Sequence, residues 1–436
     1  MIRTLLLAIS LVLMVGGAPA LAQIGLPSLP GGVMPTGRLG DLPGQVTGRT
    51  DPLERQLRAI VEPVPSSLRR LVGQSRGRLE ADPDGWPVVR GEILAVDPDP
   101  IALDRAGAAG FSVLRETRME GLDLTVVVLA PPQGMALGEG VGRLSAMDPQ
   151  GSYTFNHIHG PAGSMVPLAG SAAGPAPMPS SGRRLGLIDT GVEGRHPSLV
   201  SVALTQQGFA GPVLPAAHGT AVASLLAGRA PGFAGAAPGA DLYAADVYGG
   251  AVTGGSAEAL ARALGWMASH DVRVINISLV GPRNPLVELA VRRLVGRGYL
   301  LVAAVGNDGP AASPLFPAAY PGVIGVTAVS GRNRVLPEAG RGAQVDFAAP
   351  GADMAAASMD GGYATVRGAS FAAPIVAGLL AERMTGDSGA QALSALAQDA
   401  QDMGAAGDDP VYGRGLVGAS LRVAPRAVGA RGRLTR

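Results

Sequence analysis

Short apolar runs alternate with stretches of helical periodicity over the second half of the chain. The apolar runs are LGLI (185–188), DLYAADV (241–247), RVINISL (273–279), YLLVAAV (299–305) and GVIGVTAV (322–329). Helical spacing of apolar residues occurs between them, near 220–227, 256–269 and 285–296. Apolar strands separated by helices are typical of a parallel sheet covered on both faces. We therefore predict an α/β fold with a mostly parallel central sheet for this half.

A smaller unit with a different order of elements precedes it. Strands are predicted at 88–96, 111–116, 122–129 and 153–159, and helices at 100–109 and 136–147. The order β-α-β-β-α-β on fewer than a hundred residues is that of a small α+β ferredoxin-like sandwich. A weaker helical pattern, broken at Pro63 and Pro65, runs through 53–79.

Composition divides the chain at several points. Residues 161–182 consist almost entirely of Gly, Pro, Ser and Ala, which predicts an exposed linker where proteolytic processing would occur. We therefore assign 51–160 to the small domain, 183–421 to the α/β domain and 422–436 to a solvated basic tail. Residues 23–50, rich in Gly and Pro, predict a flexible leader.

The N-terminus has the pattern of a secretory signal peptide, assigned to residues 1–22. Arg3 is followed by an apolar stretch over 4–15 and by the small-residue pattern Ala20-Leu21-Ala22. The alternative is an uncleaved membrane anchor, but the apolar stretch is short for a span. We therefore expect export to the periplasm or the medium, with no stable membrane span after cleavage.

Composition excludes several classes of function. Hydrophobic residues make up 47% of the chain and charged residues 16%, which indicates a globular protein. A net charge of +1 gives no electrostatic reason to expect a nucleic-acid partner. The absence of Cys excludes thiol nucleophiles, thiolate metal sites and disulfides, so stability must come from a packed core.

Four polar residues stand where a reactive site would form. Asp189 directly follows one predicted strand and Asn307 comes two residues after another, and the carboxyl ends of parallel strands meet at one edge of a sheet. His218 begins a predicted helix, and Ser370 lies at the start of an apolar helix that runs to Leu380.

These residue types form a complete set for acyl transfer. A serine hydroxyl needs an adjacent base, imidazole suits neutral pH, and a buried carboxylate fixes the imidazole tautomer. The free N–H groups of a helix start favour negative charge beside the serine. Taken singly, each residue also has an ordinary structural explanation, as a turn residue, a helix cap or one of five histidines.

The motifs around these residues resemble those of the subtilisin-like serine proteases, or subtilases. The matching segments are D-T-G (189–191), H-G-T (218–220), V-I-N-I-S-L-V-G-P (274–282), A-A-V-G-N (303–307) and G-A-S-F-A-A-P (368–374). They occur in the order Asp, His, Ser known for subtilisin. The resemblance covers about 183–421, and the smaller domain resembles a subtilase propeptide.

The resemblance implies a subtilisin-like three-layer fold and a serine endopeptidase that acts on proteins or peptides. It assigns Asp189, His218 and Ser370 to the catalytic triad and Asn307 to the oxyanion. Ser278, Leu279, Val280 and Gly281 correspond to the strand that pairs with substrate backbone. Since Val280 replaces the usual Gly, we expect a preference for small or medium side chains before the scissile bond.

The resemblance also implies a zymogen that processes itself. The small domain would assist folding of the protease, act as its own intramolecular inhibitor and be released by a cut between His159 and Arg184. We expect the mature enzyme to be a monomer.

No metal or cofactor is predicted to be required. Calcium is common in the family, but the sequence contains no array of oxygen ligands that would indicate a site. His157 and His159 are two residues apart, as metal ligands on a strand can be, without an evident third ligand. A polar strand edge near the processing site, or a pH sensor for release of the small domain, explains them as well.

Three alternatives to an active subtilase were weighed. The main one is a catalytically inactive subtilisin-like binding protein, which the four competent residues disfavour. An esterase of the α/β-hydrolase fold would have Ser before Asp and His in the chain, the reverse of the order here. A relative that uses Glu in place of His does not fit His218.

Overall fold

The computed structural model describes residues 64–166, 180–384, 386 and 388–430. The predicted signal peptide and leader therefore lie outside the described residues, as does most of the predicted linker.

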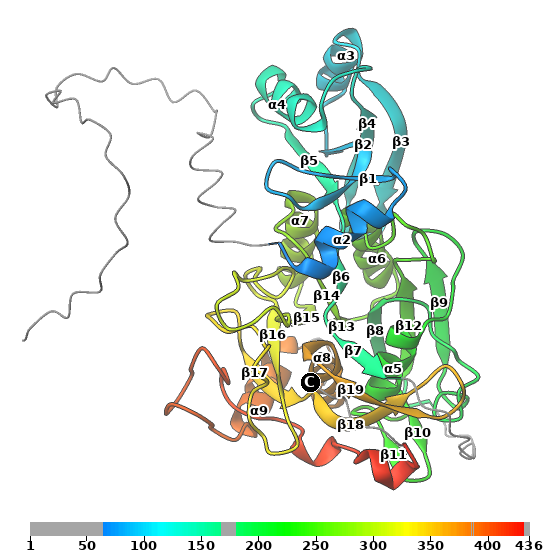
Figure 1. The fold of residues 1–436 in the computed structure, drawn as a ribbon, viewed down its shortest axis with the longest axis vertical. Coiled ribbons are helices and arrows are strands. Elements are labelled where there is room, and N and C mark those ends of the chain that lie inside the picture. Colours follow the sequence, from blue (N-terminus) through cyan, green and yellow to red (C-terminus); the bar gives the residue numbers. More distant parts are fainter. Residues whose placement is uncertain (1–63, 167–179, 385, 387, 431–436) are drawn as a thin grey trace, which may run out of the picture. The chain divides into compact units, whose positions relative to one another are not determined.

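A seven-stranded sheet forms the centre of the larger domain (Figure 1). In spatial order its strands are β17 (Phe347–Pro350), β16 (Ile324–Val329), β15 (Leu300–Ala304), β13 (Val274–Ile277), β8 (Arg184–Asp189), β12 (Asp241–Asp246) and β9 (Leu204–Gly208). Every neighbouring pair in it is parallel, which confirms the predicted central sheet. Strands β9 and β17 were not predicted, because both are short and β9 is polar and only half-buried.

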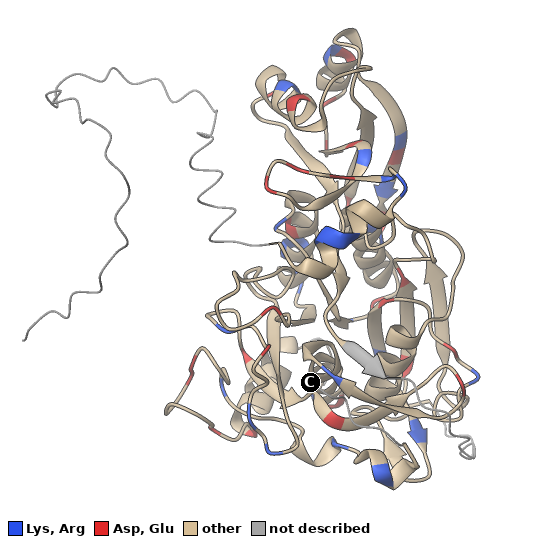
Figure 2. Ribbon diagram, viewed as in Figure 1, with Lys and Arg blue, Asp and Glu red and all other residues tan. Residues whose placement is uncertain are grey.

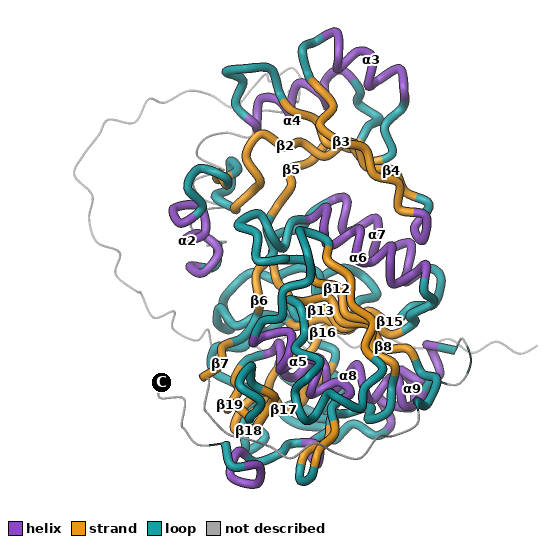
Figure 3. The backbone as a smooth tube through the Cα atoms, turned by 90° about the vertical axis from the view of Figure 1, so that its right-hand side faces the viewer, coloured by secondary structure: helices purple, strands orange, loops and turns teal. Residues whose placement is uncertain are grey.

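Helices cover both faces of this sheet, giving three layers (Figure 3). They are α5 (Ala217–Ala227), α6 (Ala257–Ser269), α7 (Pro285–Val295), α8 (Ala369–Arg383) and α9 (Gly389–Gln398). In Figure 3, α6 and α7 lie on one side of the strands and α5 and α8 on the other. Helix α8 is apolar around its whole circumference, which suits its nearly complete burial between the sheet and α5.

Residues 64–159 form a second, antiparallel unit, here called the N-terminal sandwich. After α2 (Ser66–Gln74) and β1 (Leu79–Ala81) come β2 (Pro87–Val96), α3 (Pro100–Ala108), β3 (Ser112–Met119), β4 (Leu124–Ala130), α4 (Leu137–Met147) and β5 (Ser152–His157). Its main strands lie in the order β5-β2-β4-β3, and all neighbours are antiparallel. The predicted β-α-β-β-α-β order is therefore present, with boundaries within about three residues.

The sandwich buries both faces of its central strands, β2 and β4. Ile93 and Val127 belong to its own core under α3 and α4, whereas Leu94 and Val126 belong to the core of the larger domain. Because successive residues of a strand point to opposite faces, this alternation places α6 and α7 against the second face. It explains why the run TVVVL (125–129) is apolar throughout rather than alternating.

Two predicted boundaries differ from the structure. The first residues of the predicted linker form strands: β6 (Gly160–Pro161) pairs with β14 (Leu279–Val280), and β7 (Ser164–Val166) joins β18 (Ala352–Ala357) and β19 (Tyr363–Arg367). Pairing with strands distant in sequence overrides the Gly- and Pro-rich composition. The start of the predicted solvated tail also packs, since Pro425–Val428 forms a 3₁₀ helix against β18 and β19.

Charge is spread over the molecule without a dominant sign. Figure 2 shows acidic and basic positions interspersed along the described chain. Among the described residues, no helix has the length and apolar character needed to cross a bilayer.

Candidate active site

Asp189 and His218 are held together at the carboxyl end of the central strands. Asp189 is the last residue of β8 and is fully buried, and His218 lies in the first turn of α5. Nδ1 of His218 lies 2.8 Å from Oδ1 and 2.9 Å from Oδ2 of Asp189. The carboxylate therefore accepts the Nδ1 proton and leaves Nε2 as the basic nitrogen. Nε2 is buried and has no hydrogen-bond partner.

Ser370 lies in the first turn of α8, on the same side of the sheet as α5. Its hydroxyl donates to the backbone carbonyl of Ser278 at 3.1 Å. The ring of Phe371, the next residue, packs against the ring of His218 with centroids 5.4 Å apart. The three predicted triad residues are thus gathered in one region, with the serine hydroxyl turned towards Ser278.

A proline inside α8 explains how Ser278 is fixed beside the serine. Pro374 has no N–H, so the carbonyl of Ser370, four residues earlier, receives no bond from it. The hydroxyl of Ser278 donates to this carbonyl instead, at 2.9 Å. Asn276 in turn donates to the Ser278 hydroxyl at 2.9 Å. A helix irregularity encoded by G-A-S-F-A-A-P thereby ties α8 to the segment after β13.

Asn307 follows β15 and points its amide at the start of α8. Its Oδ1 accepts the backbone N–H of Ala369 at 3.0 Å, which fixes the orientation of the side chain. Its Nδ2 donates to the carbonyl oxygen of Ala162. The backbone N–H of Ser370 donates to the same oxygen at 3.0 Å. Two donors therefore converge on one carbonyl oxygen, the arrangement that stabilises an oxyanion.

The predicted substrate-binding strand pairs with the chain's own residues 160–162. Leu279 and Val280 form an antiparallel pair with Pro161 and Gly160. The carbonyl of Ser278 accepts the N–H of Ala162 at 3.3 Å. Gly281 lies under the ring of His159, where a Cβ would come within 2.4 Å of the imidazole. All four predicted residues therefore contact residues 159–162.

Gly368 allows the close approach of two backbones at the site. Its φ of +131° lies in the region that favours glycine. A Cβ there would lie 2.9 Å from Cα of Gly163 and 3.0 Å from Nδ2 of Asn307. Any larger residue would displace either the bound segment or the oxyanion donor.

His157 and His159 have different surroundings in the structure. Nε2 of His157 lies 3.0 Å from Asp82, and Nδ1 accepts from Asn284 at 2.9 Å. His159 is fully buried, and neither ring nitrogen has a partner. Burial, and then the proximity of His157, lowers the pKa of His159 from 6.5 to about 3, so it is neutral at pH 7.

Across the described ranges, no three His, Asp or Glu side chains are grouped as a metal ion would require. The expectation that no cofactor is needed stays a prediction.

Sequence reasoning missed several residues of this region. Ala162 and Gly163 were assigned to a linker, yet they lie beside Ser370. Tyr248 donates its hydroxyl to the carbonyl of His159 at 3.0 Å, and Leu315 packs against Gly306. Only the small residues around 160–163 gave a signal, since extended backbone with small side chains fits a narrow cleft.

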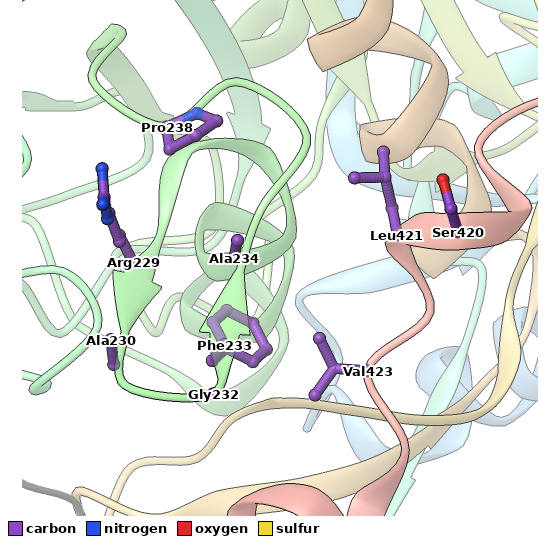
Figure 4. A pocket seen from close by; sticks show the side chains of 9 residues that line it. All are labelled: Arg229, Ala230, Gly232, Phe233, Ala234, Pro238, Ser420, Leu421 and Val423. Atoms are coloured by element: carbon purple, nitrogen blue, oxygen red, sulfur yellow. The ribbon is translucent and has the colours of Figure 1, made fainter.

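A pocket of about 440 Å³ lies elsewhere in the fold (Figure 4). It is formed by the hairpin of β10 (Arg229–Ala230) and β11 (Phe233–Ala234) together with Pro238 and the segment Ser420–Val423. Its lining contains none of the predicted site residues. We therefore assign the chemistry to the region around Ser370.

Comparison with known proteins agrees with this geometry. The model of the subtilase family matches residues 180–415, more than half of the chain. The chain belongs to the subtilase family. Subtilases are serine endopeptidases, and the match covers all four predicted catalytic positions.

Two subtilases are similar to this chain in sequence over about half of its length. Subtilisin Savinase from Lederbergia lenta is 34% identical over 254 residues, which are 55% of this chain and 90% of the relative. The minor extracellular protease Epr from Bacillus subtilis (strain 168) is 32% identical over 209 residues, 46% of this chain. This chain spans only 32% of the length of Epr.

A solved structure has the same fold. The crystal structure of fervidolysin from Fervidobacterium pennivorans, described as a keratinolytic enzyme related to subtilisin, superposes with a TM-score of 0.63. The superposition covers 80% of this chain and 62% of fervidolysin at 22% identity. At that identity the likeness concerns the fold alone, and it supports the subtilisin-like α/β architecture.

Proposed function

We propose that this subtilase is an active serine endopeptidase that uses Asp189, His218 and Ser370 as its triad and Asn307 as an oxyanion donor. The observation that carries the proposal is the carbonyl of Ala162, which accepts hydrogen bonds from Ser370 N–H and from Asn307. A peptide carbonyl held by two donors beside a serine is the position of a reacting group.

The roles follow from the geometry. Nε2 of His218 is free to accept a proton because Asp189 occupies Nδ1. For attack, the Ser370 hydroxyl turns from the Ser278 carbonyl towards Nε2 of His218. Asp189 then stabilises the imidazolium that forms, without itself taking the proton. The oxyanion receives the two hydrogen bonds already directed at the site.

The sandwich serves, in this proposal, as the pro-domain of a zymogen. It contacts the starts of the helices that flank the substrate strand: Asn156 accepts the N–H of Glu258 at 3.1 Å, and the side chain of Asn284 donates to the Phe155 carbonyl at 3.0 Å. Arg115 bridges Glu92 of the sandwich and the buried Glu258 at the start of α6. With residues 160–162 paired to β14, the domain blocks access of other substrates.

Export belongs to the same proposal. Residues 1–22 have the pattern of a signal peptide, and one relative is named an extracellular protease. The substrates would then be proteins or peptides outside the cytoplasm, and the enzyme would act as a monomer.

Labelling by a fluorophosphonate probe, combined with casein cleavage, tests the proposal. The processed wild type should be labelled and active, and Ser370→Ala should lose both properties. Ser420→Ala, an exposed serine away from the site, is the matched control and should behave as the wild type. Failure of the processed wild type to react would instead favour the inactive subtilisin-like binding protein.

A further inference from the structure

Residues 160–166 cross the active site as an extended, continuous segment. On one side of Ser370, Gly160 and Pro161 pair with β14; on the other, Ser164–Val166 pairs with β19. Strand addition on both sides is how proteases hold an extended substrate. The segment therefore lies in the site as a substrate would.

One peptide bond of this segment is presented to the nucleophile. The carbonyl oxygen of Ala162 is bonded to Ser370 N–H at 3.0 Å and to Asn307. Gly163 is next to Ser370, since a Cβ at 163 would lie 3.1 Å from Cβ of Ser370. The carbonyl of Ala162 is thus the peptide group held beside Ser370 by the two oxyanion donors.

Resting on the function proposed above, we infer that the protease cuts its own chain between Ala162 and Gly163. The sequence predicted only a window from His159 to Arg184, and the structure narrows it to one bond.

The reaction balances with the residues present and one water. Oγ of Ser370 bonds to the carbonyl carbon of Ala162 while its proton passes to Nε2 of His218. The bond from that carbon to the nitrogen of Gly163 breaks, and His218 protonates the leaving amine. Water then hydrolyses the ester, which leaves a carboxylate on Ala162 and restores Ser370.

The register of the segment disfavours a cut one bond earlier or later. Ala162, the residue before the proposed cut, donates its N–H to the carbonyl of Ser278. In a cut one bond earlier Pro161 would take this place, and proline has no N–H to donate. A slip by one residue in either direction would also exchange the faces of alternate side chains. His159 would then leave its enclosed position against Gly281.

Mass spectrometry of the full-length precursor during processing tests this inference. At the earliest times two fragments should appear, one ending at Ala162 and one beginning at Gly163. Their masses should sum to the precursor plus one water. The rate constant should not depend on precursor concentration, because the segment already lies in the site of its own molecule. A first cut at any other bond would overturn the inference.

Variants at position 162 provide a second test with a matched control. Ala162→Phe should slow processing at least ten-fold, because Ala162 is enclosed at 4% exposure. Ala162→Ser should be processed within about two-fold of wild type, which separates the size effect from misfolding. Ser181→Phe places the same bulk at an exposed position in the predicted window and should have no effect. Wild-type processing of Ala162→Phe at the same bond would contradict the inference.

Ser370→Ala separates this inference from the proposed function. If the variant stays intact but the wild type is first cut elsewhere, only the assigned bond is wrong. If the purified variant is processed like the wild type, the serine mechanism itself fails.

Discussion

The side chain of Leu315 lies against the backbone of Gly306, the residue before Asn307. A Cβ at 306 would lie 2.8 Å from Cδ1 of Leu315 and 3.8 Å from Cγ1 of Val280. The antiparallel bridge between Gly281 and Phe316 brings the Leu315 segment alongside the substrate strand. Two buried, branched side chains thus fill the space beside the oxyanion donor, in keeping with an alanine before the presented bond.

Leu315→Ala should widen the accepted range of side chains before the scissile bond. We expect kcat/KM for peptides with Phe or Leu at that position to rise about ten-fold or more relative to Ala peptides, since removed methylene groups leave room worth about 1–3 kcal/mol. Leu289→Ala, the same change on α7, should leave the ratio unchanged. Efficient cleavage after Phe by the wild type would refute the small pocket.

Asn307→Leu should impair the chemical step more than binding. Loss of one oxyanion donor lowers kcat by about 10²–10³-fold, a magnitude measured in subtilisin itself and carried over to this relative. Because the hydrogen bond strengthens as charge develops, KM should change little. Steady-state kinetics of mature enzyme on a peptide substrate measure both constants. A rise in KM with an unchanged kcat would show that Asn307 is not an oxyanion donor.

Release of the cut pro-domain should become easier in acid because of His159. Its pKa is lowered from 6.5 to about 3 when it is buried, so the free segment binds a proton more readily than the bound one. Binding is therefore strongest above pH 6.5 and weakens as the pH falls from 6.5 towards 3, by at most about ten-fold per pH unit. Co-elution of the two fragments in gel filtration between pH 5 and 8 measures this.

His159→Asn should flatten that pH dependence, whereas His270→Asn, a histidine outside the interface, should not. His157 faces the same region and is paired with Asp82. The double variant His157→Asn/His159→Asn therefore measures any part of the pH dependence that comes from His157. An unchanged pH profile in His159→Asn would assign the effect to other groups.

Arg115→Met should weaken binding of the cut pro-domain to the protease domain. Arg115 donates to Glu92 and to the buried Glu258, so its loss leaves a carboxylate at the start of α6 without its charged partner. Because the Arg115 side chain is 40% exposed, we expect only about a ten-fold rise in the dissociation constant. Recovery of protease activity on dilution of the processed mixture measures it, and Arg118→Met, an exposed arginine of the same strand, is the control.

The sequence was sufficient for the parts of the molecule that depend on local pattern. The five apolar runs predicted five parallel strands, and the helix starts at His218 and Ser370 were located within a residue or two. The placement of Asp189 and Asn307 at one edge of the sheet followed from a general rule about strand ends. These features depend on periodicity and on residue type, which a single sequence displays.

Features that depend on partners far along the chain were not predictable. Residues 160–166 are rich in Gly and small side chains, and only pairing with β14 and β19 makes them strands. The polar strand β9 is stabilised by its position next to β12, not by its own composition. The contact of Leu315 with Gly306 likewise could not be predicted, because no pattern in the sequence pairs these two residues.

The pairing of β7 with β19 has a consequence for the mature enzyme. Once Gly163 becomes a chain terminus, β7 is covalently attached to the protease only at its C-terminal end, and its departure would leave β19 with an open edge. Unsatisfied N–H and C=O groups along such an edge invite another extended chain. The backbone groups of β19 that hold β7 during self-cleavage would then be available to pair with the residues after the scissile bond of each later substrate.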